Sequence, residues 1–109
     1  MNWVRQWERL NEMPLTVPEL TFQADWLIAF ADVSSLPYSR QLSPPRLAAV
    51  IDLRYAVGRE IFESLTAFLA NLESQEYAAA AHALLHFPWP PDLGQRMAHD
   101  ARIIRKGEW

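Results

Sequence analysis

Two histidines four residues apart, His82 and His86, have the spacing in this sequence that most directly suggests chemistry. Side chains at positions i and i+4 lie on the same face of an α-helix, so the pair could hold one metal ion. A zinc site needs three or four ligands, however, and the same helix face offers Gln75 and no carboxylate. The stretch HALLH also lacks the glutamate that follows the first histidine in a metalloprotease helix. The pair is therefore a weak metal candidate, and we predict neither a metal nor a cofactor.

Arg54 is a charged residue within the apolar stripe of residues 44–73. A charge in such a stripe costs free energy unless it is paired and hydrogen-bonded. Two interpretations are open. Arg54 could bond to Asp25, to Asp32 or to a backbone carbonyl, or it could face a partner subunit or target protein, since arginine is enriched at interfaces. Gly58 follows along the same line, where it could allow close approach of another backbone or let a helix bend.

Residues 17–33 are predicted to form a helix that is apolar on most of its circumference. One apolar stripe contains Leu20, Ala24, Leu27 and Ala31. A second stripe, about 100° or more around the helix, contains Phe22, Trp26, Phe30 and Val33. The second stripe belongs either to the core or to a docking patch for another protein, where buried aromatic residues supply much of the binding energy.

The sequence contains few patterns that indicate an enzyme. Its three glycines are scattered, so they form no phosphate-binding loop. No serine or threonine stands in a nucleophile-elbow context. The carboxylates Asp52, Glu60 and Glu63 are expected on a solvated helix face, where Asp52 and Glu63 would pair with Arg59. We therefore predict that the protein is not an enzyme.

Composition narrows the class of protein further. The chain has 109 residues, half of them hydrophobic, which predicts one globular domain over residues 1–109. Its formal net charge of −3 lacks the basic footprint of a nucleic-acid binder. We expect no nucleic-acid binding even at the C-terminal basic residues, which are Arg96, Arg102, Arg105 and Lys106. The absence of cysteine excludes disulfides and Cys-ligated zinc.

Membrane association is not expected either. No stretch of the sequence approaches the ~20 apolar residues of a membrane span. The N-terminal residues, MNWVRQWERL, lack the apolar region of a signal peptide. The simplest location for the protein is the cytoplasm.

The periodicity of the apolar residues predicts an all-α fold of about five helices. Proline-containing segments separate most of the periodic stretches, and no segment shows the alternation of a β-strand. The expected helices span residues 2–12, 17–33, 44–73, 75–86 and 93–105.

The expected helix at 44–73 would form the spine on which the shorter helices pack. Its 30 residues would be ~45 Å long. A compact domain of this size has a diameter of roughly 34 Å. A straight helix would therefore project from its own subunit, so either it bends at Gly58 or a second chain covers the overhang in a homodimer.

Together these patterns predict a non-enzymatic, small helical regulatory protein that binds and masks a partner protein and forms a homodimer. Antagonists of transcription factors, immunity proteins and secretion chaperones include helical proteins of this size, although no motif selects among those classes. The alternative is a small metal-binding protein that uses His82 and His86.

Overall fold

The computed structural model describes residues 17–109 of the chain, and the side chains of residues 23–109. The predicted helix at 2–12 and the side chain of Phe22 lie outside this part. The described residues are helical and contain no β-strand, as the periodicity predicts. The elements are α2 (Val17–Ser34), the 3-10 turn η1 (Ser39–Gln41), α3 (Pro44–Val57), α4 (Arg59–Ser64), α5 (Thr66–Glu73), α6 (Tyr77–Leu85) and α7 (Pro91–Lys106).

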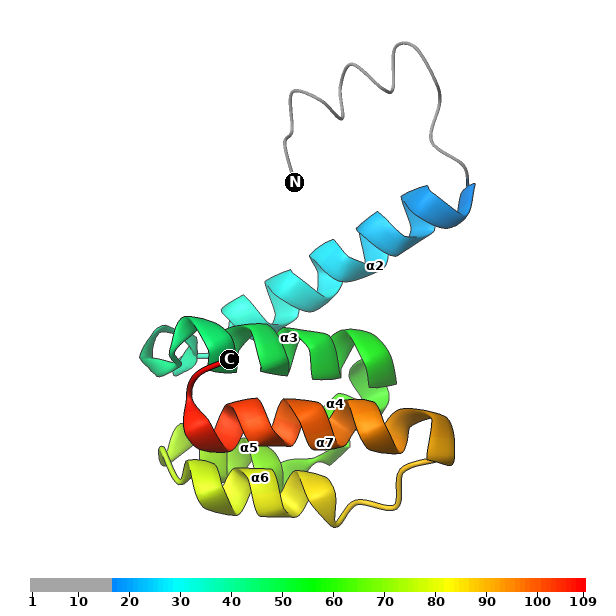
Figure 1. Cartoon of the computed structure of the whole chain (residues 1–109). Helices are drawn as coiled ribbons and strands as arrows, with labels where there is room; N and C mark the ends of the chain where they lie inside the picture. Colours follow the sequence, from blue (N-terminus) through cyan, green and yellow to red (C-terminus); the bar gives the residue numbers. More distant parts are fainter. Residues whose placement is uncertain (1–16) are drawn as a thin grey trace.

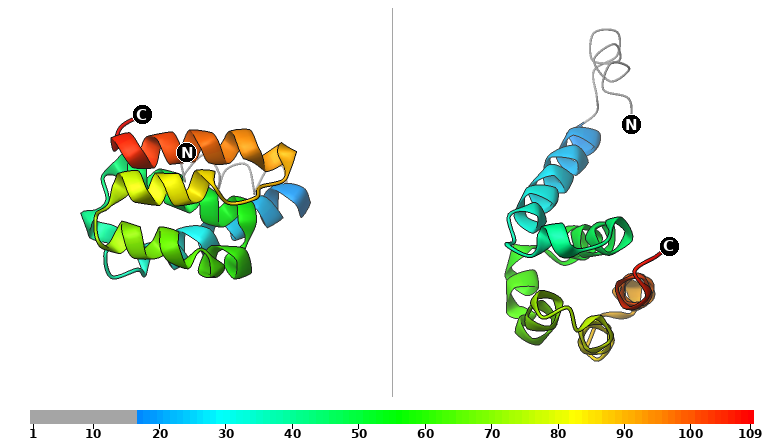
Figure 2. Two further views of the ribbon diagram at one scale, coloured as in Figure 1. Left: turned by 90° about the horizontal axis from the view of Figure 1, so that it is seen from below. Right: turned by 90° about the vertical axis from the view of Figure 1, so that its left-hand side faces the viewer.

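The helices from α3 to α7 form the body of the molecule, and α2 projects from it (Figure 1). Helix α7 packs between α3 and α6, and α6 packs in turn against α5. Helix α2 makes its main contacts with α3 and with η1, and its N-terminal half extends beyond the other described helices (Figure 2). One side of α2 is therefore packed, and the other faces away from the body.

The core is built from apolar side chains that all the larger helices supply. The largest fully buried side chains are Val33, Val50, Leu53, Phe68, Leu72, Leu84, Met97 and Ile104. Burial of a side chain of this size stabilises the fold by about 1.5–3 kcal/mol, so these contacts determine how the helices pack.

The continuous spine helix expected at 44–73 is not observed, because the chain turns at Gly58 and again at Leu65. Gly58 has φ +87° and ψ 164°, a conformation that only glycine adopts readily. Leu65 is buried, and the turn there lets Phe62, Leu65 and Phe68 all reach the core. The segment bends rather than projecting, so the argument for a homodimer from an overhanging helix loses its premise.

Arg46 fixes the C-terminal end of α7 to the start of α3. Its Nε donates to the backbone oxygen of Ile104 at 2.6 Å, and its guanidinium lies 3.7 Å above the ring of Tyr77. Ser43 caps α3 and donates to the backbone oxygen of Gly107 at 3.0 Å. Gly107 ends α7 with φ +76°, and a Cβ there would lie 2.7 Å from the Arg46 guanidinium. Both the backbone conformation and the close guanidinium of Arg46 therefore favour glycine at this position.

Candidate protein-binding surface

Helix α2 separates its apolar residues into an inner and an outer face. On the inner face Ala29 and Val33 are fully buried, and Trp26 is half-buried with its ring edge-to-face against Tyr55, 5.9 Å between centroids. We call the exposed side the outer face of α2. It consists of Ala24, Leu27, Ile28, Phe30 and Ala31.

The outer face exposes large apolar side chains to an unusual degree. Leu27 is 52% exposed, Ile28 47% and Phe30 48%. Contiguous apolar surface of this kind marks interaction sites more often than scattered single residues do. These five residues are apolar, and the exposed acid Asp25 lies at their edge, three residues before Ile28.

The structure divides the second stripe of the sequence analysis between these two faces. Trp26 and Val33 point to the body, and Phe30 lies on the outer face. Leu27 and Ile28 belong to the candidate surface, although the sequence analysis did not select them. Both stripes of α2 are apolar, so periodicity alone does not indicate which one packs on α3.

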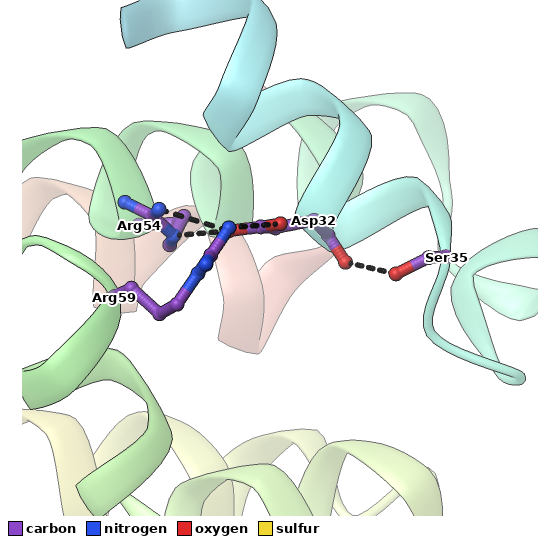
Figure 3. Close-up of polar contacts among 4 residues, drawn as sticks. All are labelled: Asp32, Ser35, Arg54 and Arg59. Carbon is purple, nitrogen blue, oxygen red and sulfur yellow. Dashed lines mark hydrogen bonds and ion pairs between the residues drawn. The ribbon is translucent and has the colours of Figure 1, made fainter.

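An ion-pair cluster anchors the C-terminal end of α2 to α3 and α4 (Figure 3). Asp32 on α2 accepts from Arg54 Nε at 2.9 Å, and Arg54 Nη2 lies 2.8 Å from the same oxygen. Arg59 on α4 donates from Nε and Nη2 to the two carboxylate oxygens of Asp32, at 3.2 and 3.1 Å. Of the partners considered for Arg54, the structure places Asp32 against it, and Arg54 is only 8% exposed.

The two arginines determine the ionisation of Asp32. Hydrogen bonds from Arg59, and next from Arg54, hold the pKa of Asp32 below its ordinary value of 3.8, against an opposing effect of burial. Gly58 lies between the two arginines in the chain, and a Cβ there would meet nothing within 4 Å. Its role within the described residues is therefore the turn itself, which allows α4 to start in a new direction.

A second cluster, which the sequence analysis missed, joins α3 to α7. Asp52 on α3 accepts from Arg96 Nε on α7 at 3.0 Å and also pairs with Arg96 Nη2. The expected pairing of Asp52 with Arg59 is thus wrong, because Arg59 binds Asp32 instead. Asp100, one turn beyond Arg96, is 3% exposed, and its buried Oδ2 accepts no hydrogen bond.

The environment of Asp100 favours its protonated form. Burial, and then the hydrogen bond to Asp52 and the charge of Asp52, raise the pKa of Asp100 to about 9. Asp100 is therefore protonated at neutral pH and donates to Asp52. Although burial acts to raise it, the pKa of Asp52 is lowered by hydrogen bonds from Arg96 and Asp100. With Asp100 almost fully buried, this pair joins α3 to α7.

His82 and His86 lie on the exposed side of α6. Their rings stack with centroids 3.9 Å apart, and Nδ1 of His86 lies 2.9 Å from the backbone oxygen of His82. Within residues 17–109 no group of three or more His, Cys, Asp or Glu residues is arranged to hold a metal ion. After His86 the chain turns at a corner, where Trp89 packs on Phe87 and donates from Nε1 to the Leu84 oxygen at 2.8 Å.

Comparison of the chain with protein-family models, with curated proteins and with solved structures finds no match. Among the helices that the structure describes, none is both long and apolar enough to cross a membrane.

Proposed function

We propose that this protein is a non-enzymatic helical regulator that binds another protein through the outer face of α2 and masks the surface it covers. One observation carries the proposal. Leu27, Ile28 and Phe30 are each about half exposed and lie within one turn of the helix. Their exposure leaves apolar surface in water that contact with a partner would remove.

The way in which α2 is attached to the body of the molecule supports this function. Asp32 holds the C-terminal end of the helix through Arg54 and Arg59, and Trp26 packs on Tyr55 further along. The outer face is thus presented on a helix that is fixed from its opposite side. Binding at this face therefore costs less conformational entropy than binding to a segment that must first become ordered.

The mode of recognition that fits is an apolar helix face placed against an apolar groove or a second helix. Antagonists, immunity proteins and chaperones all act by covering a surface of their target, and a masking role of this kind requires no catalytic group.

A capture experiment with matched variants tests the proposal. Tagged wild-type chain, Leu27→Asp and Leu85→Asp are each used to retain proteins from a lysate of the source organism. Leu85 on α6 is the control, because it is also a leucine that is 52% exposed. We expect a protein, a second copy of this chain included, that wild type and Leu85→Asp retain and Leu27→Asp loses. Identical retention by all three chains would overturn the proposal.

A further inference from the structure

The composition of the outer face of α2 restricts what can cover it. This inference rests on the proposed function and identifies the chain that covers the outer face of α2 when no target protein is bound. Charged side chains across an interface usually set which partner binds and in which register. The five apolar residues of the outer face have none, so an uncharged apolar surface is the complementary partner, and the shapes of the side chains provide selectivity.

The shapes follow a regular pattern along the helix. Leu20, Ala24, Leu27 and Ala31 are spaced by four, three and four residues, which is the spacing of a coiled-coil seam. Large and small residues alternate along this seam. A leucine side chain packs well against the space above an alanine, whereas two alanines facing each other leave a gap.

The seam is complementary to itself when two copies run antiparallel. With Leu27 of one copy opposite Ala24 of the other, the two-fold symmetry places Ala24 of the first copy opposite Leu27 of the second. Each of these two layers then joins one leucine and one alanine. In a parallel pair each residue meets its own counterpart, so layers with two alanines alternate with layers with two leucines, and packing is uneven.

The surroundings of the seam are compatible with this pairing. The positions that flank it hold Thr21, Gln23, Ile28 and Phe30, so two copies bring no like charges together. The inner face of α2, with Ala29 and Val33, is turned to α3, and Ala24, Leu27 and Ala31 are exposed on the other side. Figure 2 shows the N-terminal half of α2 extending past the other described helices.

We propose that the outer face of α2 is covered by the same face of a second copy of this chain, packed antiparallel with Leu27 of each copy against Ala24 of the other. A closed two-fold interface of this type buries the same surface on both subunits.

Light scattering coupled to size-exclusion chromatography tests whether a second copy binds. We expect wild type and Leu85→Asp to have the mass of a dimer at micromolar concentration. Leu27→Asp places a charge in the seam of both copies and should weaken self-association by at least about tenfold. Wild-type chain that stays monomeric would overturn the proposal, as would dimerisation that Leu27→Asp leaves unchanged.

Cysteine cross-linking tests the register. Because the chain has no native cysteine, disulfides can form only between the introduced residues. The variants Ala24→Cys and Leu27→Cys are prepared on chains of different mass, mixed and oxidised. We expect the mixed disulfide to form faster than either disulfide between identical variants. Preferential coupling of Ala24→Cys to itself would indicate parallel packing and overturn the arrangement.

The capture experiment described above separates this inference from the proposed function. If Leu27→Asp loses a protein other than this chain while wild type is monomeric, the proposed function stands and the second copy is wrong. If full-length Leu27→Cys is monomeric and its thiol is still protected from modification, residues of the same chain cover the face, and both ideas fail.

Discussion

Two acid–arginine clusters join α3 to its neighbours, and they contain opposite ratios of carboxyl groups to arginines. In the first, the single carboxylate of Asp32 binds two arginines, Arg54 and Arg59. In the second, the two carboxyls of Asp52 and Asp100 share one arginine, Arg96. An excess of cations keeps a carboxylate ionised, and an excess of carboxyls forces one of them to hold a proton.

The difference determines which pH change weakens each cluster. The pKa of Asp32 is lowered, so its contribution to stability is present above 3.8 and is lost as the pH falls through the lower value in the folded protein. The pKa of Asp100 is raised to about 9, so the folded protein keeps a proton that the unfolded chain releases. Acid therefore weakens the contact of α2 with α3, and alkali weakens the contact of α7 with α3.

Removal of Asp32 should have the largest effect. Arg54 is only 8% exposed, and Asp32→Ala removes the carboxylate that its guanidinium binds, so we expect the free energy of unfolding to fall by about 2–3 kcal/mol. Urea unfolding at neutral pH measures the loss. Asp25→Ala is the control, because Asp25 is an exposed acid on the same helix and its removal should change stability by no more than about 0.5 kcal/mol. Equal effects of the two variants would show that the cluster does not anchor α2.

Replacement of Asp100 by an amide tests the second cluster. In wild type the free energy of unfolding should decline as the pH rises between 3.8 and about 9, because the folded state binds one more proton than the unfolded chain over that range. Asp100→Asn donates a hydrogen bond to Asp52 without binding a proton. At about pH 8 we expect it to be more stable than wild type by at least about 1 kcal/mol.

Urea unfolding of both chains at about pH 5 and about pH 8 measures the slope. Asp92→Asn, an exposed acid in the first turn of α7, is the control and should keep the decline seen in wild type. A decline of the same size in Asp100→Asn would mean that Asp100 does not hold the proton.

The sequence predicts the helices well because apolar periodicity and proline act locally. The helices expected at 17–33, 75–86 and 93–105 are observed as α2, α6 and α7 within a few residues at each end. The breaks within 44–73 are not predictable in the same way. A glycine costs only about 1 kcal/mol inside a helix, so Gly58 is compatible with either a turn or a continuous helix. The apolar pattern continues across it because α3, α4 and α5 all face one core.

The candidate surface is harder to predict because it depends on which of two similar faces packs. Nothing in the spacing of Trp26 or Leu27 indicates that one is inner and the other outer, since the choice is made by contacts with α3. Asp100 does carry a local signal. It lies three residues after Met97 and four before Ile104, within the buried stripe of α7, where an acid needs a partner or a proton.

Arg59 should matter least for stability and most for the ionisation of Asp32. Because its side chain is exposed, we expect Arg59→Ala to change the free energy of unfolding by less than either Asp32→Ala or Asp100→Asn does. The difference in stability between Arg59→Ala and wild type should become smaller in high salt. The hydrogen bond from Arg59 is nevertheless the largest influence that lowers the pKa of Asp32. The pKa of that carboxyl, followed by carbon NMR, should therefore rise in Arg59→Ala, while the titration of Asp100 stays as in wild type. A loss of stability as large as that of Asp32→Ala would instead place the anchor of α2 in the exposed Arg59 pair rather than in the buried Arg54 pair.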